Sequence, residues 1–175
     1  ECRAVREVVG LTDLTSFAKY EVTGTNAHAL LERVCANRVP AKDGAVVLSQ
    51  MLTPLGGIES EATVTRLAKD HYYLLSGAVA ELHDFDWLVQ HIKPGEDVAV
   101  GNVTDDYGVL VLSGSKSREV LSSLTDAGLT NEDGFTWMSA KEITVAEIAV
   151  RALRVSYVGE LGWELHCPMD RLADL

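Results

Sequence analysis

Two strand-like stretches stand close together in the sequence, at residues 45–52 and 58–67, with only the five residues Thr-Pro-Leu-Gly-Gly between them. Their Val, Thr, Leu and Ile residues favour extended backbone, and a short connection that contains glycine is typical of a β-hairpin. A further turn at residues 69–70 leads into another strand-like stretch at residues 71–76. This part of the chain is therefore predicted to form an antiparallel sheet.

Apolar residues recur elsewhere at the spacing of one helical face, i, i+3, i+4 and i+7. The first such stripe, with Thr25 as predicted N-cap and Asn37 as the end, consists of Ala27, Leu30, Leu31, Val34 and Cys35. The second, closed by Pro94-Gly95, consists of Leu82, Phe85, Leu88, Val89 and Ile92. A third, short helix is predicted at residues 115–124, with Ser115 as its cap.

The remaining strand-like stretches are also joined by short turns. Residues 17–22 alternate so that Ala18, Tyr20 and Val22 share one face. Further strands are predicted at residues 97–103, 107–112, 148–158 and 163–167, the last two joined by a short turn. Strands joined mostly by turns, with interspersed helices, predict an α+β fold with largely antiparallel sheets.

The composition excludes several classes of partner. The 175 residues are 47% hydrophobic and 23% charged, as in globular proteins, and the net charge of −11 disfavours both nucleic acid and anionic membranes. No apolar run approaches the ~18 residues of a membrane span. The sequence starts with Glu1 rather than Met, and we expect the chain to be a piece of a larger protein.

The three cysteines, Cys2, Cys35 and Cys167, are too scattered for a disulfide framework or a zinc site. This pattern predicts a reduced, cytoplasmic setting. The histidines do not cluster, and His83 and His91 are interpreted as part of a solvated helical face, so no metal site is predicted. None of the common motifs of hydrolases, metalloproteases or nucleotide-binding proteins is present.

Acidic residues gather at two turns. Glu59 and Glu61 are two apart, which places them on one strand face, while Glu160 and Glu164 bracket the turn before the last strand. Such carboxylates can accept paired N–H groups of a ligand or take up a proton, or they can be edge charges that discourage aggregation. Tyr157 and Trp163 flank the same last turn, either as a pocket wall or as core packing. These patterns leave the alternatives open.

Five segments in order carry a resemblance to a known family: residues 10–37, 51–67, 74–88, 102–114 and 154–166, the last reading RVSYVGELGWELH. Together they resemble the folate-binding half of dimethylglycine and sarcosine dehydrogenases, which is similar to the aminomethyltransferase (T-protein) of the glycine cleavage system. Residues 125–147 match little. The resemblance implies a T-protein-like folate-binding fold, here a fragment that lacks the C-terminal barrel. It also implies one subdomain from residues 1–24 and 101–175, and an inserted one from residues 25–100.

The resemblance also implies site residues. T-proteins carry Gly-Gly-x-x-Asp-Asp after the hairpin turn; here Ser60 stands at the first Asp and Glu61 at the second, the candidate catalytic carboxylate. Glu164 matches the residue that holds the pterin ring, through two parallel N–H donors. Tyr157 matches a tyrosine that lines the site. Gly77 stands at a position of the site where T-proteins often have Asn.

The implied function is capture of a one-carbon unit by tetrahydrofolate as 5,10-methylenetetrahydrofolate. The parent protein would be an enzyme that oxidatively demethylates an N-methylglycine derivative on an upstream FAD domain, so its partners would be a small-molecule substrate and folate. We expect the isolated fragment to be inactive. Two alternatives stay open: a stand-alone aminomethyl- or methyltransferase of the same fold, and a degenerate interaction module without catalysis.

Overall fold

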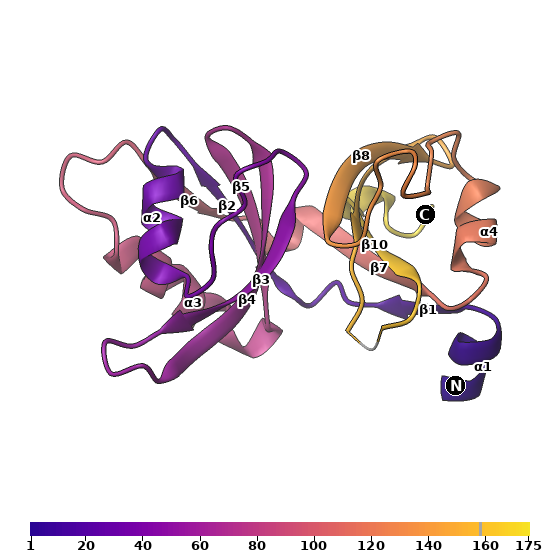
Figure 1. Cartoon of the computed structure of the whole chain (residues 1–175), viewed down its shortest axis with the longest axis horizontal. Helices are drawn as coiled ribbons and strands as arrows, with labels where there is room; N and C mark the ends of the chain where they lie inside the picture. The colour runs from indigo at the N-terminus through magenta and orange to yellow at the C-terminus, as the bar shows by residue number, and fades with distance from the viewer. Residues whose placement is uncertain (158) are drawn as a thin grey trace. The chain divides into compact units, whose positions relative to one another are not determined.

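The computed structural model describes residues 1–157 and 159–175, and these divide into two compact units. Unit 1 consists of Glu1–Thr15 and Asp105–Leu175, and unit 2 of Ser16–Thr104. Each unit has a five-stranded sheet and a hydrophobic core of its own (Figure 1). The fold is α+β with antiparallel sheets, as predicted.

The sheet of unit 2 has the strand order β3-β4-β5-β2-β6, and its neighbouring strands are antiparallel. The strands are β2 (Ala18–Thr23), β3 (Val46–Leu52), β4 (Ile58–Ala68), β5 (His71–Ser76) and β6 (Ala99–Asn102). The helices are α2 (Ala27–Val34), η1 (Ala78–Ala80) and α3 (Glu81–Gln90), and η2 (Thr104–Asp106) leads into unit 1. The hairpin prediction is confirmed, since β3 pairs with β4 across residues 53–57. Because β2 pairs with β5 and β6, residues 18–23 belong to this unit; its boundaries differ from the predicted 24/25 and 100/101.

The core of unit 2 confirms the first predicted stripe. Buried residues from α2 and from one face of β2 pack in the same cluster: Ala18, Tyr20, Val22, Ala27, Leu30, Leu31 and Val34. The predicted N-cap is wrong. The cap position is Asn26, whose side chain accepts a bond from Asp97 N, while Thr25 Oγ1 donates to the Asp97 carboxylate, 2.8 Å away.

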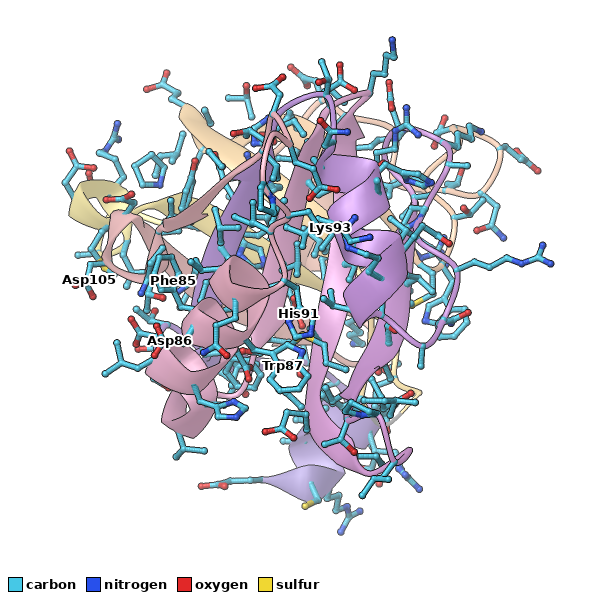
Figure 2. All side chains as sticks on the ribbon, turned by 90° about the vertical axis from the view of Figure 1, so that its left-hand side faces the viewer. Phe85, Asp86, Trp87, His91, Lys93 and Asp105 are labelled. Atoms are coloured by element: carbon cyan, nitrogen blue, oxygen red, sulfur yellow. The ribbon has the colours of Figure 1, made fainter. Side chains whose placement is uncertain are left out.

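The second predicted stripe is partly wrong. Leu82 and Val89 are 74% and 40% exposed, whereas the buried residues of α3 are Asp84 and Leu88, one turn apart. Phe85 packs at the margin of the core, and Asp86 points outward from the same helix (Figure 2). The buried face of α3 contains the carboxylate of Asp84. It therefore differs from the face that hydrophobicity alone indicates.

The sheet of unit 1 has the strand order β1-β7-β10-β9-β8, again antiparallel. The strands are β1 (Gly10–Asp13), β7 (Tyr107–Ser113), β8 (Ser139–Val145), β9 (Ile148–Arg154) and β10 (Gly162–Pro168). The helices are α1 (Cys2–Glu7), α4 (Ser117–Ser122) and η3 (Met169–Arg171). The predicted strand at 148–158 ends at Arg154, and Val158 lies outside the described residues. The N-cap of α4 is Lys116 and not the predicted Ser115.

Three elements of unit 1 were not predicted: α1, β1 and β8. Helix α1 has no buried residue, so its sequence carries no apolar stripe. Strand β8 reads SAKEITV: Ile, Thr and Val at its end favour a strand, but Ala, Lys and Glu are depleted in strands, and β8 pairs with β9 along its whole length. Within the described residues, no helix is long and apolar enough to cross a bilayer.

The partly buried Cys35 and the buried Cys167 both pack with the apolar cores. Burial raises the pKa of the Cys35 thiol to about 11, and it also raises the pKa of Cys167, which is fully buried. Both thiols therefore stay protonated and poorly nucleophilic at neutral pH.

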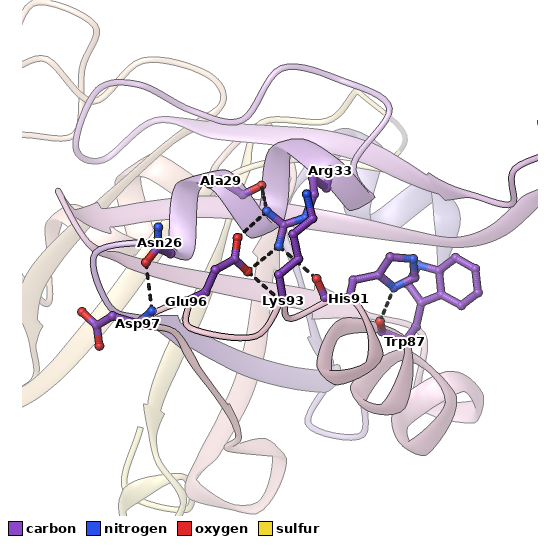
Figure 3. A network of polar contacts seen from close by, with 8 residues as sticks. All are labelled: Asn26, Ala29, Arg33, Trp87, His91, Lys93, Glu96 and Asp97. Atoms are coloured by element: carbon purple, nitrogen blue, oxygen red, sulfur yellow. Dashed lines mark hydrogen bonds and ion pairs between the residues drawn. The ribbon is translucent and has the colours of Figure 1, made fainter.

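A bidentate ion pair ties α2 to the segment that follows α3 in unit 2 (Figure 3). Arg33 Nη1 and Nη2 donate to the two carboxylate oxygens of Glu96 at 2.8 and 2.6 Å, and Nη2 also donates to the His91 carbonyl. Lys93 N donates to the same carboxylate. The bonds from Arg33, and to a lesser extent the bond from Lys93, hold the pKa of Glu96 below its usual range.

In a Glu96→Gln variant, the stability of the protein is therefore expected to depend less on pH in the acidic range. A lowered pKa contributes stability that is present above the ordinary carboxyl pKa and lost as the pH falls through the folded value. Urea midpoints measured from pH 6 to pH 3 (roughly the range of carboxyl titration) should fall less steeply in this variant. The exposed Glu119 of α4, changed to Gln, is the control. An unchanged slope in Glu96→Gln would refute the assignment.

Candidate functional site

The predicted catalytic residue, Glu61, lies on β4 with an exposed side chain. Gln50 stands opposite it on β3 and donates from Nε2 to Glu61 Oε2, at 2.7 Å. The neighbouring Ala62 is buried in the core of unit 2, so Glu61 faces away from the helices. The carboxylate is thus oriented by one neutral donor and remains open to a ligand.

A β-bulge separates Glu59 from Glu61. Met51 pairs with Ser60 and Leu52 with Ile58, which leaves Glu59 as the extra residue. As a result both Glu59 and Ser60 contact α3, although adjacent residues of a regular strand face opposite sides. The prediction that Glu59 and Glu61 share one face is wrong, because the bulge interrupts the alternation between them.

A polar network lies where the bulge meets α3. Asp84 is fully buried, and its carboxylate accepts bonds from Ser60 Oγ at 2.7 Å and from His83 Nδ1 at 3.0 Å. The other ring nitrogen of His83 lies 2.8 Å from Glu59 Oε1. The bond to Asp84, followed by the bond to Glu59, raises the pKa of His83. His83 is exposed, as expected for the predicted solvated helical face, but it also bonds to two carboxylates, which the sequence did not predict.

Sequence reasoning missed Asp84 altogether. The one available signal was its position four residues before Leu88, which places both on the same helical face. Ser60, at the first Asp of the T-protein pattern, donates to this buried carboxylate rather than providing one.

Gly77 follows β5 with a φ of −66°, so it needs no glycine-specific backbone. A Cβ built at this position would meet nothing within 4 Å. A Cβ atom would therefore fit, and glycine leaves open space at this point of unit 2.

In unit 1, Glu164 lies in the middle of β10 and is 6% exposed. The residues opposite it are Val111 on β7 and Leu153 on β9, both aliphatic. His166, two residues further along, has Nε2 3.3 Å from Glu164 Oε2. Glu164 is therefore a largely buried carboxylate between apolar neighbours, with one histidine beside it.

The structure decides between the two interpretations of the aromatic residues at the last turn. Trp163 is fully buried and packs edge to face against Phe135, so it belongs to the core of unit 1. Tyr157 is 69% exposed. Glu160 forms an ion pair with Arg6 at 3.4 Å.

A cavity of about 310 Å³ lies at the connection between β9 and β10 in unit 1. Its described lining consists of Trp137, Arg154, Val155, Ser156, Gly159, Glu160, Leu161 and Gly162. Arg154 also donates to Asn131 Oδ1 at 2.6 Å, which ties the preceding loop to the sheet. Most of its lining comes from residues 154–162, within the motif that carries the family resemblance.

The four predicted site residues are divided between the units: Glu61 and Gly77 lie in unit 2, and Tyr157 and Glu164 in unit 1. The functional role of each of the four stays a prediction. Over residues 1–157 and 159–175, no group of three His, Cys, Asp or Glu is placed to hold a metal ion.

Comparison with known proteins gives a consistent result. The family model described as "GCVT N-terminal domain" matches residues 1–175. Mitochondrial dimethylglycine dehydrogenase of Homo sapiens is 40% identical over 167 residues, covering 95% of this chain and 19% of the relative. An aminomethyltransferase of Chloroherpeton thalassium is 35% identical over 166 residues, covering 94% of this chain and 45% of the relative.

Among solved structures, the glycine cleavage system aminomethyltransferase T from Bartonella henselae superposes with a TM-score of 0.84 at 26% identity. The match covers 98% of this chain and 45% of that protein. The chain thus spans about a fifth of the dehydrogenase and just under half of each aminomethyltransferase.

Proposed function

The chain belongs to the family of the GCVT N-terminal domain, and on this premise we propose that it forms the tetrahydrofolate-binding region of a flavin-linked N-methylglycine dehydrogenase. The aminomethyltransferase-like fold and the similarity to dimethylglycine dehydrogenase support the proposal. The observation that carries it is Glu164, a buried carboxylate flanked by aliphatic side chains on a sheet of that fold.

The surroundings of Glu164 fit the edge of a pterin ring. Its Oε1 accepts no hydrogen bond from any described residue, while Oε2 lies beside His166. A 2-aminopyrimidinone edge presents two parallel N–H donors, which a carboxylate accepts as a pair. Val111 and Leu153, which stand opposite Glu164, make the surroundings of the carboxylate apolar, as suits a flat ring.

The proposed role of Glu61 is to accept a proton or to position the reacting groups. Tetrahydrofolate, when bound, supplies the nitrogen nucleophiles that capture the one-carbon unit as 5,10-methylenetetrahydrofolate. Glu61 is exposed and held by Gln50, so its carboxylate can receive the proton that leaves such a nitrogen. Gly77 in unit 2 and Tyr157 in unit 1 are the other residues for which we propose a binding role.

The proposed FAD belongs to another part of the parent protein. The prediction of a cytoplasmic location stays a prediction; the dimethylglycine dehydrogenase that resembles this chain is a mitochondrial protein.

A stand-alone aminomethyltransferase is the second candidate, favoured by the 35% identity to the Chloroherpeton protein. Oxidation of dimethylglycine or sarcosine by the purified full-length protein, with a flavin spectrum, distinguishes the dehydrogenase from it. The degenerate module has weaker support: Ser60 has no carboxylate, but the Glu61 carboxylate is present.

Glu164→Gln is the direct test of folate binding. Loss of a hydrogen bond to a charged acceptor costs about 1.5–3 kcal/mol, so the Kd for tetrahydrofolate is expected to rise about 10- to 150-fold. Isothermal titration calorimetry of the full-length protein measures it. Glu119→Gln, which removes an exposed carboxylate of α4 in the same unit, is the control and should leave the Kd unchanged.

Glu61→Gln separates chemistry from binding in the same protein. Its Kd should stay near that of the wild type, while folate-dependent product formation falls about 10²- to 10⁴-fold. Unchanged folate binding in Glu164→Gln would overturn the proposed site, and unchanged product formation in Glu61→Gln would overturn the proposed catalytic role.

A further inference from the structure

Glu164 and His166 form a buried pair on one face of β10. Being two residues apart in a strand, they point to the same side of the sheet, while the core of unit 1 takes the alternate residues Trp163, Leu165 and Cys167. The side chains of Glu164 and His166 are 8% and 0% exposed. Their polar atoms, Oε2 and Nε2, are 3.3 Å apart.

The chemistry of the pair indicates which nitrogen of His166 carries a proton. An ionised carboxylate only accepts hydrogen bonds, so His166 must carry a proton on Nε2 to bond with Glu164. A largely buried carboxylate needs such a donor, because its loss of hydration is otherwise uncompensated. The residues opposite Glu164 on the neighbouring strands, Val111 and Leu153, have no donor in their side chains.

We infer that His166 is a positioning residue for the ligand carboxylate Glu164. The Nε2–H group holds Oε2 and thereby sets the rotation of the carboxylate, so that Oε1 is presented to the N–H donors of the ligand. This inference rests on the proposed folate site and adds to it the residue that orients its acceptor. It also narrows the ligand class to planar groups with two adjacent N–H donors, one for Oε1 and one for the remaining lone pair of Oε2.

The matched variants are His166→Gln and His166→Met in the full-length protein. Gln and Met are close in length and volume, but only Gln can donate a hydrogen bond to Glu164. The Kd for tetrahydrofolate should rise about 10- to 100-fold in His166→Met and stay within a few-fold of the wild type in His166→Gln. The KM for tetrahydrofolate should follow the Kd, with kcat at saturating folate unchanged.

A double-mutant cycle tests whether His166 acts through Glu164. If it does, Glu164→Gln combined with His166→Met should bind folate no more weakly than Glu164→Gln alone, because the two losses are one interaction. Additive losses would show that His166 acts independently of Glu164 and would overturn the inference.

The outcomes separate this inference from the proposed function. Unchanged affinity in Glu164→Gln contradicts the folate site itself. A weakened Glu164→Gln together with wild-type affinity in His166→Met contradicts only the role of His166. If the Met variant fails to fold, the wild-type protein can be tested instead. ¹⁵N NMR of its His166 imidazole should show a proton on Nε2. A ring that is protonated on Nδ1 alone would overturn the inference.

Discussion

Substitution of Trp163 by alanine is expected to lower the free energy of unfolding by about 3–5 kcal/mol, the usual effect of truncating a fully buried aromatic side chain. Trp163 is 0% exposed, and its ring centroid lies 6.2 Å from that of Phe135. The guanidinium groups of Arg118 and Arg154 lie 5.8 and 5.9 Å from the same indole. The substitution therefore removes the centre of the unit 1 core and two cation–π contacts together.

One property of the indole opposes this loss. Trp163 Nε1 is buried without a hydrogen-bond partner among the described residues, and such a donor costs about 1–3 kcal/mol. This cost is smaller than the loss of packing, so the alanine variant remains destabilised. Trp163→Phe keeps much of the aromatic surface and removes the unpaired N–H group, and it should therefore lose clearly less stability than Trp163→Ala.

Urea denaturation followed by far-UV circular dichroism measures both effects. Trp137 is 65% exposed, and its replacement by alanine is the matched control, with an expected change within about 0.5 kcal/mol. Equal losses in Trp163→Ala and Trp137→Ala would contradict the assignment of Trp163 to the core.

Substitution of Asp84 by alanine is expected to lower the free energy of unfolding by about 1.5–3 kcal/mol, because bonds to a charged acceptor are lost. The buried carboxylate joins α3 to the bulge of β4 through His83 and Ser60. Asp86 is exposed on the same helix (Figure 2), so Asp86→Ala should change stability by at most about 0.5 kcal/mol.

The pH dependence gives a second measure of the Asp84 network. The pKa of His83 is raised above its ordinary value of 6.5, chiefly by Asp84. The bonds of His83 therefore stabilise the fold fully below pH 6.5 and lose this contribution as the pH rises through the raised pKa. Asp84→Ala should flatten the fall in the urea midpoint above that pH, and a fall as steep as in the wild type would contradict the network.

The two predicted helical stripes show how well the local hydrophobic pattern predicts which residues of a helix are buried. In α2 every stripe residue from Ala27 to Val34 is buried, because an apolar face and a core face coincide. In α3 the same reasoning placed Leu82 and Val89 inside, although both are exposed. The difference lies in Asp84, whose burial depends on donors from Ser60 and His83 and is not encoded by hydrophobic spacing.

Some residues of the candidate site could likewise be predicted from the sequence, and others could not. Glu61 and Glu164 were predicted from a resemblance carried by short motifs, whose residue types and spacing are visible in the sequence. The network around Asp84 was not, because its members come from two elements joined through a bulge. His166 is only two residues from Glu164, yet its contact became evident only when β10 was placed in a sheet beside apolar neighbours.

The sequence by itself determined most of the strands and turns, the antiparallel hairpins and the α+β class, since alternation and turn residues act over a few neighbouring positions. It also determined the family, through five motifs in order. It did not determine α1, β1 and β8. The tertiary structure alone decided that Trp163 is core, that the bulge separates Glu59 from Glu61, and that Asp84 and Glu164 are buried carboxylates with histidine partners. The physical reason is that burial and hydrogen-bond partners depend on segments distant in sequence, which no local pattern contains.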